Sequence, residues 1–380
     1  MKKIFKISGI VVLLAGIGYF VWSNSGRTAK SNEVALHIDT TFSVNSDSGK
    51  GNVIGINPFM IPEDYSRKDQ FIKKIKGYLD TCQSLGWLND KTTVVLPEYI
   101  GSWLAVEGEK NQIYQSEHVT QAIGTFISSN LFSYIHAWLM CPDDAEDKVK
   151  HSVFAMKGQH LANLYLEIFS QLSREYGITI IAGSILLPNP EVRKGKIITH
   201  KGSLENVSAV FDPKGNMYPV LTRKSYPTKD ELLFIKKSLP TDPVMYDLPI
   251  GKTAVMICAD SWYPESYLRI KNGHPLFVAV PSYTQKDFSM MEKWEGYSGS
   301  KAPKDVDSKD IGTITLRDAW LKYTIPARIK ESGASYGMIV NLRGTLWDLG
   351  TDGELMIYNK GNIIYPTPRK GASIINLWLN

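Results

Sequence analysis

Residues 253–265 read TAVMICADSWYPE. The first five are apolar or β-branched, which favours a buried strand, and the polar turn after Cys258 can open a helix. A thiol at the carboxyl end of a strand, followed by free backbone N–H groups, is placed to be ionised and to share an oxyanion site. Taken alone, however, the stretch also fits a small cysteine buried in a core, so other residues must decide between the two interpretations.

Two ionisable residues occupy similar positions elsewhere in the chain. Glu98 follows the apolar run 94–96 and Pro97, and burial there would raise the pKa of its carboxyl group and make it a usable general base. Lys224 follows an expected strand at 217–221, and its ammonium group could stabilise a developing oxyanion near that carboxylate. Taken one at a time, both residues also fit surface charges at strand ends.

Strands and helices alternate along most of the sequence. Further strands are expected at 53–57, 92–96, 178–185, 206–211, 276–280, 336–342 and 373–379, and helices at about 66–85, 159–176 and 317–332. This alternation predicts a layered α/β fold. The hairpin-like pair at 206–211 and 217–221 predicts that the sheet is mixed.

Short motifs follow one another along the chain: Leu96-Pro97-Glu98, residues 177–184, Arg223-Lys224, residues 256–260 with Pro264-Glu265, and Trp320, Arg328 and Glu331 before Val340-Asn341. Together they resemble the nitrilase superfamily, the carbon-nitrogen hydrolases. The resemblance covers about residues 52–380 and implies a four-layer α-β-β-α sandwich, usually completed by subunits that pack helical faces together. One such motif is weak, but several in the same order are fairly specific.

The resemblance also implies a role for each site residue. Cys258 attacks a carbonyl carbon, Glu98 accepts the thiol proton and later activates water, and Lys224 holds the oxyanion together with the backbone N–H of Ala259. Glu231 matches an additional glutamate of the family and would orient Lys224 and the substrate. A thioester forms and releases ammonia or an amine, and water or another acceptor then completes the cycle. No cofactor and no metal are expected.

The resemblance also predicts the substrate, and two segments of the sequence look like additions to the α/β core. Asp260 stands two residues after the cysteine and resembles amidase-type members more than true nitrilases, which predicts an amide substrate. The interval between Glu98 and Lys224 is longer than usual because of an aromatic, helical insert at about 105–158. A second insert at about 285–312 is a charged loop that contains Trp294, and the sequence fits a lid as well as a disordered surface.

The first 51 residues are expected to lie outside the hydrolase domain of residues 52–380. Residues 7–26 carry no charge, so residues 1–24, with a membrane segment over 4–24, are predicted to be a single-pass transmembrane signal-anchor. Lysines before this segment favour a periplasmic or extracellular catalytic domain. A cleaved signal peptide is the alternative, but no Ala-x-Ala or lipobox cysteine is present. Residues 25–51 are rich in Ser, Asn, Gly and Lys and are predicted to be a tether.

The distribution of charge limits the kinds of molecule that the chain is expected to bind. The net charge of +5 is spread over 43 basic and 38 acidic residues, which gives no case for nucleic acid. We expect the chain to bind a small-molecule or acylated amide substrate, to contact a membrane through its N-terminal helix, and to form a homo-oligomer.

The cysteines are a separate question. Cys82 has the helical spacing of a core residue, and Cys141 could pair with it, although the sequence does not decide this.

Two other functions stay open at this stage. A thioester-forming N-acyltransferase at the membrane uses the same chemistry, but such enzymes carry several transmembrane segments. A catalytically silent binding protein would use the two inserts as a partner surface. The cost of burying a glutamate and a lysine without a task argues against the silent protein.

Overall fold

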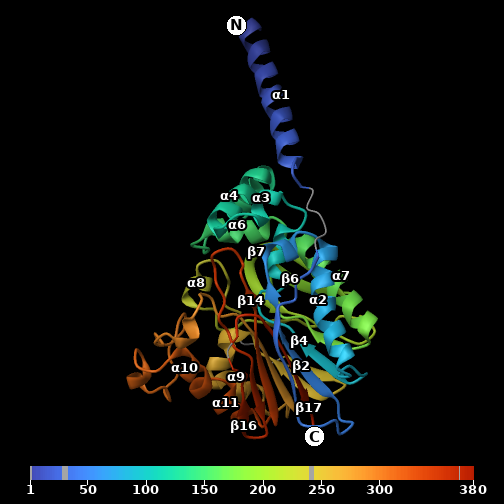
Figure 1. Cartoon of the computed structure of the whole chain (residues 1–380). Coiled ribbons are helices and arrows are strands. Elements are labelled where there is room, and N and C mark those ends of the chain that lie inside the picture. The colour runs from blue at the N-terminus through green and yellow to red at the C-terminus, as the bar shows by residue number, and fades with distance from the viewer. Residues whose placement is uncertain (1, 28–32, 239–243, 368) are drawn as a thin grey trace.

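The computed structural model of the chain describes residues 2–27, 33–238, 244–367 and 369–380 (Figure 1). Two six-stranded sheets stand face to face, and helices cover their outer faces. The apolar side chains form one core between the sheets and one core between each sheet and its helices. The predicted four-layer α-β-β-α sandwich is therefore confirmed.

The first sheet combines strands from both ends of the sequence. Its central strands β2, β4 and β5 are parallel, whereas β17 runs antiparallel to β2 and parallel to the edge strand β1. In spatial order the strands are β1 (Ile38–Val44), β17 (Ala372–Trp378), β2 (Asn52–Asn57), β4 (Thr92–Val95), β5 (Thr179–Ile181) and β8 (Val210–Phe211).

The second sheet is built from the C-terminal part of the chain. Its strands β11, β12 and β13 are parallel, and the strands outside them are antiparallel to their neighbours. In spatial order they are β10 (Met245–Leu248), β11 (Gly251–Val255), β12 (Phe277–Ser282), β13 (Tyr336–Asn341), β15 (Met356–Asn359) and β16 (Asn362–Ile364). Both sheets are mixed, as the sequence predicts.

Strand residues are apolar at consecutive positions because both faces of each sheet are covered. In β2, Val53 packs in the core between the sheets, and Ile54 packs against the helices. In β11, Val255 faces the first sheet and Ala254 faces the outer helices. The sheets approach closely at Gly55 of β2, where a Cβ atom would lie 2.4 Å from the Met338 sulfur.

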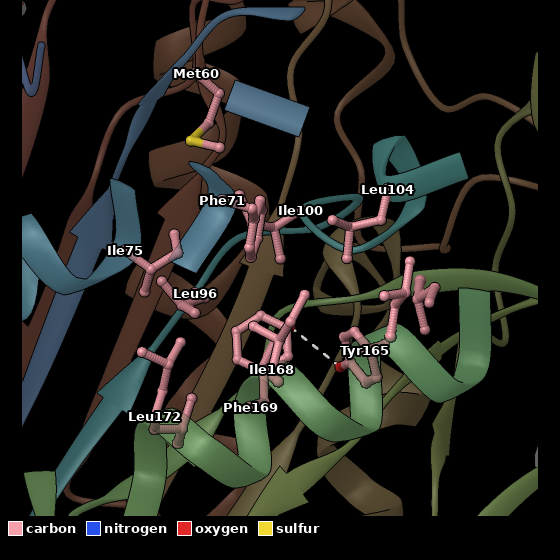
Figure 2. Close-up of a cluster of buried hydrophobic side chains, with 14 of the residues drawn as sticks. Met60, Phe71, Ile75, Leu96, Ile100, Leu104, Tyr165, Ile168, Phe169 and Leu172 are labelled. Carbon is pink, nitrogen blue, oxygen red and sulfur yellow. Dashed lines mark hydrogen bonds between the residues drawn. The ribbon is translucent and has the colours of Figure 1, made fainter. Parts of the chain in front are cut away.

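Two long helices, α2 (Lys68–Ser84) and α7 (Gly158–Tyr176), cover the first sheet. Figure 2 shows Phe169 and Leu172 of α7 packed near Leu96 and near Phe71 of α2. The second sheet is covered by three shorter helices, α9 (Pro264–Lys271), α10 (Leu316–Tyr323) and α11 (Ile325–Arg328).

Smaller elements lie around the sandwich. Strands β6 (Ile185–Arg193), β7 (Lys196–Ser208) and β9 (Thr222–Arg223) form a three-stranded antiparallel sheet, and β3 (Phe59–Met60) pairs with β14 (Arg343–Gly344). The single-turn elements are α8 (Lys229–Leu232) and the 3-10 helices η1 (Pro62–Tyr65), η2 (Ser102–Val106), η3 (Cys258–Trp262), η4 (Ser289–Met291), η5 (Ser308–Asp310) and η6 (Ile329–Ser332).

Both predicted inserts are folded. Residues 105–158 contain helices α3 (Asn111–Tyr114), α4 (Val119–Ser129), α5 (Leu131–Leu139) and α6 (Lys148–Ala155), which lie between the sheets and the N-terminal helix (Figure 1). Residues 285–312 pack Trp294, which is only 4% exposed, against the rings of Trp262 and Tyr323. This aromatic packing holds part of the second insert against Trp262 and Tyr323.

The predicted transmembrane segment at residues 4–24, and with it the single-pass localisation, is wrong. Residues Lys2–Asn24 form helix α1, but within the described ranges no helix combines the length and the apolar character that crossing a bilayer requires. An uncharged run predicts a span only where the helix that contains it meets both conditions.

Part of the predicted tether is a strand. Ile38–Val44, within residues 25–51, form β1 and pair in parallel with β17. Phe42 and Val44 pack partly against the core between the sheets, while Thr41 and Ser43 are exposed. Because only every second residue is covered, the segment keeps the polar composition on which the tether prediction rested.

All three cysteines are free thiols. Cys82 lies in α2 and is fully buried in the core, as its helical spacing predicts. The pairing with Cys141 that the sequence left open is not formed.

Candidate active site

Three different sheets deliver the predicted site residues to one place. Glu98 follows β4 of the first sheet, Cys258 follows β11 of the second sheet, and Lys224 follows β9 of the three-stranded sheet. The residues are 1%, 7% and 2% exposed, respectively. Side chains that are distant in the sequence thus share one buried environment.

The Lys224 ammonium group lies between two carboxylates. Its Nζ atom donates to Glu98 Oε1 at 2.8 Å and to Glu231 Oε1 at 2.7 Å. Burial lowers the pKa of Lys224, but the charges of Glu231 and Glu98 outweigh that effect and raise it above its ordinary value. Lys224 therefore remains a cation in this site.

The carboxylate of Glu98 is held by two donors. Oε1 accepts the bond from Lys224 and a second bond from Nδ2 of Asn206 at 2.8 Å. Burial raises the pKa of Glu98 to about 7, although the charge of Lys224 opposes the shift. The group can consequently exchange a proton near neutral pH, which agrees with the predicted shift.

The surroundings of Cys258 favour the neutral thiol, whereas the sequence suggested a position where the thiol would be ionised. Burial and the negative charge of Glu98 raise the pKa of the Cys258 thiol, and Lys224 offsets this only in part. The S–H group donates to the Tyr283 carbonyl oxygen at 3.9 Å. A neutral thiol beside a carboxylate of pKa about 7 can transfer its proton during attack, so no resident thiolate is needed.

The backbone at Cys258 is conformationally restricted. Its φ of 46° lies in the left-handed region, which a residue with a side chain adopts only when its surroundings enforce it. Cys258 also opens the 3-10 helix η3, so the N–H of Ala259 has no partner within that helix. This N–H is thus available as a donor beside the thiol.

Glu231 contacts Lys224 from helix α8. Its Oε1 atom also accepts a bond from the Tyr99 hydroxyl, and Oε2 accepts from the Thr228 N–H at 2.7 Å. Burial raises the pKa of Glu231, but the charge and hydrogen bond of Lys224 outweigh burial and lower it. Glu231 is therefore a fixed anion that holds the ammonium group in place.

Three further residues at the site were not predicted. Asn206 in β7 binds Glu98 through its side chain, and its carbonyl accepts the Lys224 N–H at 2.9 Å. An asparagine inside an otherwise β-rich run was the available signal for it. Tyr99 and Tyr283 are half-buried and lie edge to face with ring centroids 6.0 Å apart. Their pairing depends on the fold and had no counterpart in the sequence.

Comparison with known proteins gives a family match and a shared fold. Residues 142–300 match the family model described as carbon-nitrogen hydrolase, a range that includes Lys224, Glu231 and Cys258 but begins after Glu98. None of the curated proteins matches the chain by sequence.

Two solved structures are similar to this chain. A double mutant of the amidase from Nesterenkonia sp. AN1, in complex with acrylamide, matches with a TM-score of 0.52 at 12% identity, covering 88% of this chain and 93% of that chain. Saccharomyces cerevisiae Nit3, a member of branch 10 of the nitrilase superfamily, has a TM-score of 0.49 at 14% identity, covering 87% and 92%. Residues 142–300 are therefore similar to the carbon-nitrogen hydrolase family, and the chain shares its fold with the amidase from Nesterenkonia sp. AN1.

Proposed function

We propose that the protein hydrolyses a non-peptide amide, with Cys258 as nucleophile, Glu98 as general base and Lys224 as oxyanion donor. The observation that carries this proposal is the buried contact of Lys224 with Glu98 and Glu231 beside a thiol. Burying three ionisable groups and a thiol together costs free energy, which a structural role alone does not explain.

The first half of the reaction forms a thioester. The Cys258 sulfur attacks the amide carbonyl carbon while its proton moves to Glu98. Negative charge develops on the carbonyl oxygen, where the Lys224 ammonium group and the Ala259 N–H would stabilise it. The carbon-nitrogen bond then breaks, and the leaving nitrogen takes the proton from Glu98 and departs as ammonia or an amine.

The second half regenerates the enzyme. Glu98 removes a proton from water, which attacks the thioester carbonyl. The carbon-sulfur bond breaks, a carboxylic acid leaves, and the proton returns to the Cys258 sulfur. A pKa of about 7 suits Glu98 for this exchange because it must accept and release a proton in each half-reaction.

The test is the release of ammonia or amine from a panel of short amides and acylated peptides. We expect turnover by the wild-type protein, loss of turnover in Cys258→Ala, and retention in Cys141→Ala, a matched removal of a second thiol distant in sequence. Intact-mass measurement after rapid acid quenching should show the acyl adduct on wild type and Cys141→Ala but not on Cys258→Ala. Turnover that survives Cys258→Ala would contradict the proposal.

The same assay separates hydrolysis from acyl transfer. A hydrolase yields the free carboxylic acid whether or not a second amine is present. An N-acyltransferase yields a new amide when an acceptor amine is added, at the expense of the acid. Product analysis with and without the acceptor therefore distinguishes the two functions.

A further inference from the structure

We propose that Asp260 is a positioning residue that fixes the Lys224 loop against the Cys258 loop. This inference rests on the proposed function, because it assigns to Asp260 the alignment of the nucleophile and the oxyanion donor. In the sequence, Asp260 indicates only an amide substrate. Its contacts in the structure indicate that it holds two loops together.

One carboxylate binds both loops. Oδ1 of Asp260 accepts the backbone N–H groups of Ser225 at 2.9 Å and Tyr226 at 2.8 Å, the two residues directly after Lys224. Oδ2 accepts the N–H of Ile257 at 3.2 Å, the residue directly before Cys258. The side chain thus joins the residues that flank the two reacting groups, and Asp260 is only 5% exposed.

Strand pairing does not provide this connection. Lys224 follows β9, which in the described part of the chain pairs with β7, whereas Cys258 follows β11, which pairs with β10 and β12. The two loops also meet where the rings of Tyr226 and Tyr263 stack at 3.8 Å between centroids. Stacked rings can slide over each other, but three hydrogen bonds to one carboxylate fix a direction as well as a distance.

The relative position of the Cys258 thiol and the Lys224 ammonium group should strongly affect the rate of amide cleavage. A displacement of about 1 Å between reacting groups can cost about 10²-fold in rate. The strained backbone of Cys258 makes the site sensitive, because the residue before it is held by Asp260. Loss of the carboxylate would release both loops at once.

Asp64 offers a matched control. It is a buried aspartate, 3% exposed, in the 3-10 helix η1, and its Oδ2 accepts the N–H of the helix-capping residue Ile61 at 3.0 Å. Asp260 makes the same capping contact in η3 through Ile257. Asp64 pairs with Lys74 and has no contact with the Lys224 loop among the described residues.

The experiment compares Asp260→Asn with Asp64→Asn. An asparagine oxygen can keep the bonds from Ser225 and Tyr226, but its amide group would face the Ile257 N–H, so one of three bonds is lost. We expect kcat for amide release to fall by about 10²-fold in Asp260→Asn, with KM changed less than about threefold. Asp64→Asn should lower the melting temperature and leave kcat within about twofold.

A second readout needs no amide substrate. Iodoacetamide labelling of Cys258 should slow by about tenfold in Asp260→Asn and remain unchanged in Asp64→Asn, because displaced Lys224 no longer favours the thiolate. If the wild-type protein releases no amine from any amide, the proposed function fails, but this labelling still tests the positioning role. Wild-type kcat and labelling in Asp260→Asn would overturn the inference, as would equal losses of kcat in both variants.

A third variant distinguishes the loss of positioning from misfolding. Asp260→Glu keeps the charge and the acceptor atoms but displaces them by one methylene group. We expect a folded protein with an intermediate loss of kcat and an unchanged KM. A kcat equal to that of wild type in this variant would also overturn the positioning role.

Discussion

Nζ of Lys224 lies 2.8 Å from Oε1 of Glu98, although 126 residues separate them in the sequence. Both side chains are buried, so each charge depends on the other for compensation. Removing one partner of a buried ion pair costs about 3–5 kcal/mol in typical cases. Substitutions at this pair should therefore keep the shape of the side chain, as Glu98→Gln does.

The pH dependence of amide release should follow Glu98. Its pKa is raised to about 7, and only the ionised form can accept the thiol proton. We expect kcat/KM to fall about tenfold per pH unit below pH 7. Burial raises the pKa of Asp260 to about 6, so its protonation should steepen the fall below that pH. A flat profile between pH 5 and 8 would contradict the assignment of Glu98 as base.

The same shift predicts an effect on stability. The folded-state pKa of Glu98 lies above the ordinary value of 4.5, so the folded protein retains a proton that the unfolded chain releases. Its stabilising contribution is complete below pH 4.5 and is lost as the pH rises through about 7. Glu98→Gln should lose this component of the pH dependence. Thermal unfolding of both proteins at several pH values measures the difference.

Glu231→Gln and Tyr99→Phe should separate two effects on Lys224. The glutamine removes a charge from the ammonium group, so we expect a loss of about 2 kcal/mol in unfolding free energy and a clear fall in kcat. The phenylalanine removes only the hydroxyl that donates to Glu231, so kcat should fall less than about tenfold. Steady-state kinetics and denaturant unfolding test this order, and a larger effect of Tyr99→Phe would contradict it.

Gly55→Ala should destabilise the sandwich. Its new Cβ atom would lie 2.4 Å from the Met338 sulfur and 3.0 Å from a Leu355 methyl group. Overpacking of this kind costs about 1–3 kcal/mol. Gly124→Ala in α4 is the control, because a Cβ there meets nothing within 4 Å. The control should be neutral or slightly stabilising in urea unfolding, since alanine is the better helix former.

Trp347 connects the helical insert to the loop that follows β14. Its Nε1 donates to the Ile113 carbonyl at 2.8 Å, and its ring lies 5.2 Å from that of Trp103. Trp347→Ala should cost about 2–3 kcal/mol, less than a fully buried tryptophan because the ring is half-buried. Asp348→Asn, which alters an exposed pair with His118, should change the melting temperature much less. Equal effects would show that the ring is not the connection.

Strand β1 should contribute to stability as part of the sandwich. Phe42 packs against the core between the sheets, and its neighbour Thr41 is exposed. Phe42→Ala should lower the unfolding free energy by about 1–2 kcal/mol, with Thr41→Ala near wild type. Urea unfolding of both variants measures this, and two equal values would indicate that β1 does not dock.

The main strands were predictable because their apolar runs are bounded by turns. Residues 92–96 and 373–379 were expected as strands, and the structure has Thr92–Val95 and Ala372–Trp378. The strands that pair with them in the sheet were not predictable, because strand pairing depends on tertiary contacts that a run of residues does not encode. The half-polar strand Ile38–Val44 was missed for the opposite reason, since it has too few apolar residues to stand out.

The site was predictable only in part. Glu98, Lys224 and Cys258 each stand at a strand end, and their family resemblance singled them out together. Asn206 reaches Glu98 only through folding of a distant segment. Tyr99 directly follows Glu98, but its contact with Glu231 also depends on folding, and no local pattern predicts its φ of 62°. The sequence did not indicate that the pKa of Cys258 is raised, because it shows neither how deeply the thiol is buried nor how close the Glu98 charge lies.

The position of β17 between β1 and β2 has a consequence for biosynthesis. Asn45, beside β1, binds the carbonyl of Trp378 in β17 across 333 residues of sequence. Until the ribosome has released residues 372–378, the nascent chain contains β1 and β2 without the strand that pairs with both of them. Both unpaired edges then depend on protection from neighbouring chains, so this protein should place a high demand on chaperones during synthesis.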